Sequence, residues 1–188
     1  MSNPSLASVM AYQNQDVIDR FVKIFAVEEA EAQQLFDDVK RWLWMANQVK
    51  QQGINKPVVI DSALLVLDEM WHNFILFSRE YGEFCQTYFG RFCHHAPNSK
   101  REIEKEQQRT AGMTIAERKR EIMESKRWQY EFVYDHLGEE TFIRWYKVFP
   151  KKYGAETLSK MAYEAEKARQ KSKRDELEKA KQVRQVAA

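Results

Sequence analysis

Hydrophobic residues recur at helical spacing along most of the chain. In residues 16–27 they fall three or four positions apart, which predicts an amphipathic helix. Residues 28–53 repeat the pattern, with acidic side chains at the beginning and Gly53 at the end, as expected of a second helix. A connector containing Pro57 separates this helix from the next apolar stretch.

The next predicted helix is the longest apolar one. Asp61 or Ser62 suits its N-cap, and the pattern continues into the mid-80s, before Gly90 and Pro97 interrupt it. One side of this helix is apolar and consists of Leu67, Met70, Phe74, Phe77 and Tyr81. We therefore expect a long central helix that the other helices bury.

The pattern changes twice in the second half of the chain. Residues 99–127 are so rich in charge that they predict a protruding arm or an exposed helix pair, whereas aromatic side chains return immediately afterwards. Residues 159–188 have no broad apolar stripe and predict a charged, exposed C-terminal helix. The prediction is an all-α fold with one compact helical domain over residues 15–158 and a flexible N-terminus over residues 1–14.

Composition supports this fold class and excludes several kinds of protein. The chain of 188 residues is 44% hydrophobic and 31% charged, with few glycines and prolines, which favours helices over sheets. No run approaches the roughly 18 apolar residues of a membrane span, and the first residues do not form a signal peptide. Two cysteines do not make a disulfide framework, so we expect a reduced, cytoplasmic protein.

The C-terminal helix is the candidate surface for a protein partner. Residues 159–188 carry nine basic and five acidic side chains. The interspersed acids weaken any affinity for phosphate groups and argue against nucleic acid, as does the overall net charge of +2. One hypothesis is therefore a non-catalytic adaptor that uses this charged periphery.

The stretch from residue 67 to residue 98 concentrates the candidate chemistry. It holds three of the four histidines and both cysteines. Asp68 and His72 lie four positions apart, so they share one face of the predicted helix. Because Gly90 ends the helical region and Pro97 disfavours helix at the residue before it, the chain must turn and bring the paired histidines back.

This convergence predicts a metal site. The expected ligands are Asp68, His72, His94 and His95, with Cys85 and Cys93 as further candidates and Trp71, Arg79 and Tyr81 as neighbours. Imidazole, carboxylate and thiolate suit zinc or iron, and an open coordination position would allow metal-assisted hydrolysis. However, the spacing matches no established metal motif, and no nucleophile or phosphate loop accompanies it. The alternative is a metal-free polar cluster with a structural role.

Several of these residues resemble a known family. The elements Asp68-x-x-Trp71-His72 and His94-His95-x-Pro97, together with the intervening residues Ser78-Arg79-x-Tyr81, Phe84-Cys85 and Phe89-Gly90, resemble the glycine-rich domain-containing protein-like family. The resemblance extends over roughly residues 16–153. It implies a helical module of unknown function in which the histidines meet. Many relatives in that family read Trp-His-x-His, whereas this chain has Phe74 at the second histidine position.

Overall fold

The computed structural model describes residues 3–186, with side chains described as far as Gln182. The elements are α1 (Leu6–Met10), α2 (Gln15–Phe25), α3 (Glu29–Gln51), the 3-10 turn η1 (Ser62–Leu64), α4 (Leu65–Ile75), α5 (Ser78–Phe89), α6 (Lys100–Thr110), α7 (Ile115–Leu137), α8 (Glu139–Ile143), the π-helical turn η2 (Arg144–Val148), α9 (Phe149–Lys152) and α10 (Ala155–Val186). No strand occurs in residues 3–186, which confirms the all-α prediction. Over the same residues, the helices are too short or too polar to cross a membrane.

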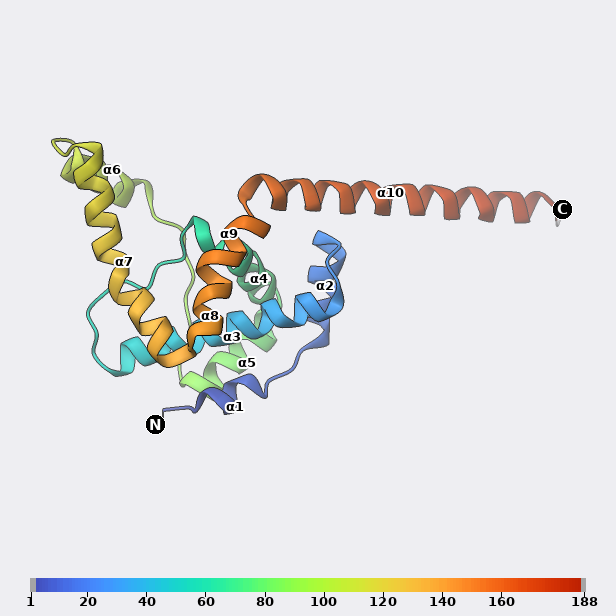
Figure 1. Ribbon diagram of the computed structural model, residues 1–188. Helices are drawn as coiled ribbons and strands as arrows, with labels where there is room; N and C mark the ends of the chain where they lie inside the picture. Colours follow the sequence, from blue (N-terminus) through green and yellow to red (C-terminus); the bar gives the residue numbers. More distant parts are fainter. Residues whose placement is uncertain (1–2, 187–188) are drawn as a thin grey trace.

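Helix α3 forms the centre of the domain. It runs through the middle of the packed elements in Figure 1, and it contacts α1, α2, α4 and α7. Its apolar stripe is buried, and the ring of Trp42 packs against that of Trp145 with centroids 5.8 Å apart. A buried ion pair joins Asp38 of α3 to the guanidinium of Arg144 at 2.7 Å. The central position that we expected for the helix beginning near residue 61 therefore belongs to α3.

The long helix expected from residue 61 is broken in two. Helix α4 ends at Ile75, and α5 begins at Ser78 after Phe77 leaves the helical conformation with ψ 63°. Ten residues of continuous α-helix would separate Trp71 from Tyr81 by about 15 Å along the axis. The break instead lets the Trp71 indole N–H donate to the Tyr81 hydroxyl at 3.1 Å. Neither residue at the break is a glycine or proline, so the sequence carried no conventional signal for it.

The N-terminal segment is packed, contrary to the flexible N-terminus that we expected. Ser5 caps α1, and Val9 is fully buried. The Trp44 indole N–H donates to the carbonyl of Pro4 at 2.9 Å, and the buried Lys40 ammonium donates to the carbonyls of Met10 and Tyr12. Lysine can be buried here because these carbonyls and the nearby Asp37 satisfy its donors.

The charged segment forms a helix pair that projects from the domain. Helix α6 and the first turns of α7 extend away from the packed helices (Figure 1), and α6 has no buried residue. Ser99 and Thr114 begin the two helices with capping boxes. Arg109 of α6 joins the two helices through its ion pair with Glu121 of α7, and it also pairs with Glu106 on its own helix. We call this helix pair the α6–α7 arm.

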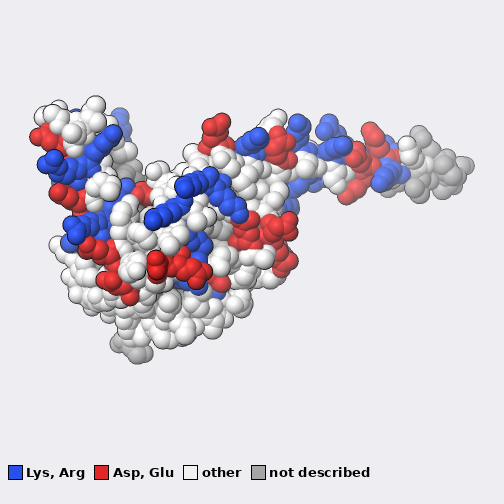
Figure 2. Space-filling view, in the orientation of Figure 1, with Lys and Arg blue, Asp and Glu red and all other residues white. Residues whose placement is uncertain are grey.

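Helix α10 is attached at its beginning and then leaves the domain. Leu158 and Ala165 are buried, and the first turns of the helix pack against α2. The rest of the described helix extends far beyond the other elements (Figure 1). Figure 2 shows basic and acidic side chains mixed along it, which agrees with the interspersed charges in the sequence.

Candidate metal centre

Three of the predicted ligands converge at the surface of α4. Asp68 and His72 project from this helix, and His95 reaches them from the loop after α5. One ligand atom from each of the three lies within 4.8 Å of the other two. Nε2 of His95 lies 2.9 Å from Nε2 of His72 and 3.1 Å from Oδ1 of Asp68. Two imidazoles and a carboxylate are thus gathered around one point.

A short chain of buried contacts positions His95. The Tyr81 hydroxyl donates to the carbonyl of Cys93 at 2.5 Å, which ties the loop to α5 two residues before His95. The Trp71 indole N–H donates to the same hydroxyl, while the face of its ring packs on the His95 imidazole with centroids 4.1 Å apart. Trp71 therefore fixes both the loop and the orientation of the imidazole. Partners of this kind orient the ligands in metal sites.

The cluster is open to solvent on one side. The His72 side chain is 50% exposed, that of Asp68 is 24% exposed, and that of His95 is 18% exposed. Burial lowers the pKa of His95 below its usual value, an effect that the nearby Asp68 carboxylate opposes and His72 reinforces. A lowered pKa keeps the imidazole neutral near pH 7, which is the form that binds a metal.

His94 does not join the three ligands. Its side chain is exposed, and its ring packs against Phe92 with centroids 5.0 Å apart. Burial alternates along the loop, since Cys93 is buried, His94 exposed and His95 half-buried. Neighbouring side chains in a non-helical segment point in different directions, so only one of the paired histidines reaches α4. The sequence alone carried no signal that separates the two, because the direction of each side chain depends on the contact of the Tyr81 hydroxyl with the Cys93 carbonyl.

Cys85 and Cys93 form a separate pair of free thiols. Both are buried, and a hydrogen bond joins them. This bond from Cys93 lowers the pKa of Cys85 to about 7, and it raises the pKa of Cys93. Neither thiol belongs to the group formed by Asp68, His72 and His95. Among the described residues, the two thiols therefore lie next to Tyr81 and outside the ligand cluster.

The remaining predicted neighbours differ in their roles. Trp71 and Tyr81 are buried and support the cluster, as described above. Arg79 is exposed on the first turn of α5, and within residues 3–182 no hydrogen bond or ion pair joins it to Asp68, His72 or His95.

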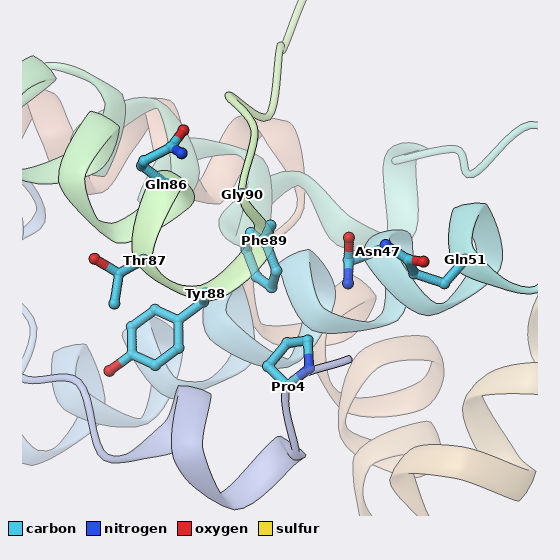
Figure 3. A pocket seen from close by; sticks show the side chains of 8 residues that line it. All are labelled: Pro4, Asn47, Gln51, Gln86, Thr87, Tyr88, Phe89 and Gly90. Carbon is cyan, nitrogen blue, oxygen red and sulfur yellow. The ribbon is translucent and has the colours of Figure 1, made fainter. Parts of the chain in front are cut away.

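A separate cavity adds no ligand to the cluster. It measures about 250 Å³ and lies where Pro4 and α3 meet the end of α5 (Figure 3). Its lining residues are Pro4, Asn47, Gln51, Gln86, Thr87, Tyr88, Phe89 and Gly90. None of these side chains is a carboxylate, imidazole or thiol. The cavity is therefore a neutral polar hollow, distinct from the candidate metal centre.

The separations within the cluster suit coordination to one ion. Four-coordinate zinc with bonds of about 2.1 Å places tetrahedral ligand atoms about 3.4 Å apart. The separations of 2.9 Å and 3.1 Å that involve His95 are slightly shorter, so small side-chain rotations would open room for the ion. The two ring nitrogens of His72 face different partners. Its Nδ1 atom lies 3.8 Å from Oδ2 of Asp68, and its Nε2 atom faces Nε2 of His95.

The chain belongs to the UCP032817-like family, whose model matches residues 9–126. The resemblance to the glycine-rich domain-containing protein-like family is therefore wrong. The matched residues include Asp68, His72 and His95 but end within α7, so they also stop short of residue 153, where we expected the resemblance to end. No curated protein and no solved structure matched the chain.

Proposed function

We propose that Asp68, His72 and His95 bind a divalent transition metal, with zinc or iron as the first candidates. The observation that supports this proposal is the convergence of the three ligand atoms from two segments that are distant in the sequence. Two histidines and one carboxylate form the ligand set of many catalytic zinc sites and of non-haem iron sites.

The exposure of the cluster favours a ligand role over a purely structural one. Buried polar groups must pair with each other to avoid a desolvation cost of several kcal/mol. His72 is half exposed and could be hydrated by water instead, so burial does not force it to face His95. The supporting contacts from Trp71 and Tyr81 place His95 toward His72, which an ion-binding role accounts for directly.

Three protein ligands would leave a coordination position for water. A bound metal lowers the pKa of such a water to about 7, which supplies hydroxide for hydrolysis. In this role, Asp68 offsets part of the charge of the ion and the two imidazoles bind it in their neutral form. The open side of the cluster gives a substrate access to this position. Metal-assisted hydrolysis is therefore the reaction that we propose for the site.

A zinc titration of metal-stripped protein tests the proposal, with His94 as a matched control. Supporting groups around metal ligands contribute about ten- to hundredfold to affinity, so loss of a ligand should cost at least as much. We expect His72→Ala to weaken zinc binding at least about a hundredfold. His94→Ala, which removes a neighbouring histidine outside the cluster, should leave the affinity unchanged. Equal affinities in the two variants would favour a metal-free structural cluster.

The second candidate function is a non-catalytic adaptor that binds a protein partner through α10. It is supported by the outer part of this helix, which extends beyond the domain with exposed side chains (Figure 1). Deleting residues 172–188 leaves the buried Ala165 in place, so the melting temperature should change little while the partner is lost. Retention of the partner by the shortened protein would exclude α10 as the contact surface. We propose a cytoplasmic location for either function, because both cysteines are free thiols.

A further inference from the structure

A second site of different chemistry lies where α10 packs against α2. A cavity of about 480 Å³ is lined there by Asp19, Arg20, Lys23, Ile24 and Arg169. Three of these five side chains are cations, and they come from two helices at opposite ends of the sequence. The contacts between α2 and α10 bring them together.

The positive charge in this cavity is only partly compensated. Among residues 3–182, no ion pair involves Arg20 or Lys23, and Asp19 accepts a hydrogen bond from Gln15 at 2.8 Å. The Arg20 guanidinium donates to the buried amide of Asn73 at 2.5 Å, a neutral partner that positions the cation without neutralising it. Three cations, the lining carboxylate of Asp19 and the Glu166 carboxylate that pairs with Arg169 therefore leave an excess of one positive charge at the cavity.

Arg169 contributes a donor that lacks an acceptor. Its Nε and Nη2 atoms donate to Glu166 on the preceding turn. Its Nη1 atom is buried and finds no hydrogen-bond partner among residues 3–182. A buried, unsatisfied donor is costly, and the cost is larger for a charged group. An anionic oxygen at this position would satisfy it after a small rotation of the long side chain.

We propose that this cavity binds a phosphate-bearing anion. A phosphate monoester carries close to two negative charges near pH 7, so the excess positive charge at the cavity attracts it. Its oxygens can accept from the two guanidinium groups, whose planar donors suit phosphate, and from the ammonium of Lys23. The volume exceeds that of the phosphate group alone and falls in the range of small-ligand pockets. Ile24 offers an apolar contact for the organic part of the ligand.

The site combines residues that the family model matches with one residue that it does not match. Arg20 and Lys23 lie within the residues that the UCP032817-like model matches, whereas Arg169 lies outside them. The first turns of α10 thus complete a basic surface that α2 begins. This assignment is independent of the proposed metal centre, because none of the five lining residues belongs to that cluster.

Calorimetric titration of the metal-stripped full chain with inorganic phosphate tests this assignment, with sodium chloride of equal ionic strength as the reference. A hydrogen bond to a charged group contributes enough to change affinity about tenfold. We expect saturable phosphate binding that Lys23→Gln and Arg169→Gln each weaken about tenfold. The control Lys171→Gln removes an exposed lysine of α10 that does not line the cavity, and it should bind phosphate like the wild type.

The source of the phosphate group is tested with vesicles of phosphatidylcholine, with and without phosphatidic acid. Retention on phosphatidic acid that Lys23→Gln abolishes would identify a lipid headgroup as the ligand. Phosphate binding without such retention would identify a soluble phosphate ester. The proposal would be overturned by the absence of saturable phosphate binding. Equal weakening by Lys171→Gln would also overturn it, because diffuse charge would then explain the binding.

Discussion

The candidate metal centre and the α6–α7 arm both gather polar side chains, but they do so at different sequence distances. In the arm, Arg109 pairs with Glu106 three residues away, and the helices begin with local capping boxes. In the metal centre, His95 meets Asp68 and His72 across a gap of more than twenty residues. Local charge pairs stabilise an exposed helix without any further role. Convergence across such a gap needs a buried framework, and this difference is what points to function.

The largest expected effect comes from removing Trp71, which together with Tyr81 forms the buried framework that positions His95. Trp71 is buried and contacts both Tyr81 and His95, so Trp71→Ala should lower the free energy of unfolding by about 3–5 kcal/mol. Arg109→Ala in the arm should lower it far less, since exposed ion pairs contribute little. Urea denaturation measures both values. Similar losses in the two variants would contradict the contrast between the regions.

A smaller effect is expected from removing the Tyr81 hydroxyl, which is part of the same framework. Tyr81→Phe keeps the ring but removes the donor to the Cys93 carbonyl and the acceptor for Trp71. We expect it to cost about 1–3 kcal/mol, because two buried polar groups are left unpaired. It should also weaken zinc binding about tenfold through the position of His95. Urea denaturation and a zinc titration of the same sample separate the two effects. Unchanged zinc affinity despite the lost stability would show that the loop does not position the ligand.

The smallest expected effect is a pH dependence that originates in His95. Burial lowers the pKa of His95 in the folded protein, so below its usual value of about 6.5 the unfolded chain binds the proton more readily. The contribution to stability is present above that pH and is lost as the pH falls through the lower pKa of the folded state. Melting temperatures between pH 5 and pH 8 should therefore decline less steeply on the acid side for His95→Gln than for the wild type. If the melting temperatures of the two proteins fell equally steeply with pH, His95 would not be the source of the pH dependence.

Much of the fold followed from helical periodicity, because α2, α3 and the exposed helices bury or expose whole faces. The break between α4 and α5 did not, because Phe77 leaves the helix without a glycine or proline. This break brings Tyr81 to Trp71 and so sets the position of the loop. The prediction of a flexible N-terminus was also wrong for the described residues, because the contacts of this segment with Lys40 and Trp44 depend on tertiary structure.

The candidate site shows the same limit of sequence reasoning. The spacing of Asp68 and His72 on one helix is local, and it could be predicted from the sequence. The choice between His94 and His95 depends on how the loop is tied to α5, which spacing alone does not contain. The cations Arg20, Lys23 and Arg169 were missed for a similar reason, because their convergence requires α10 to pack against α2.

Elemental analysis of the protein purified without a metal-affinity column tests the central claim most directly. The account predicts close to one zinc or iron ion per wild-type chain and per His94→Ala chain. It predicts loss of that metal in His95→Ala, which removes the ligand closest to both of the others. Circular dichroism would verify that His95→Ala remains folded. Wild-type protein with far less than one ion per chain, and with a stability that a chelator does not change, would contradict the metal centre.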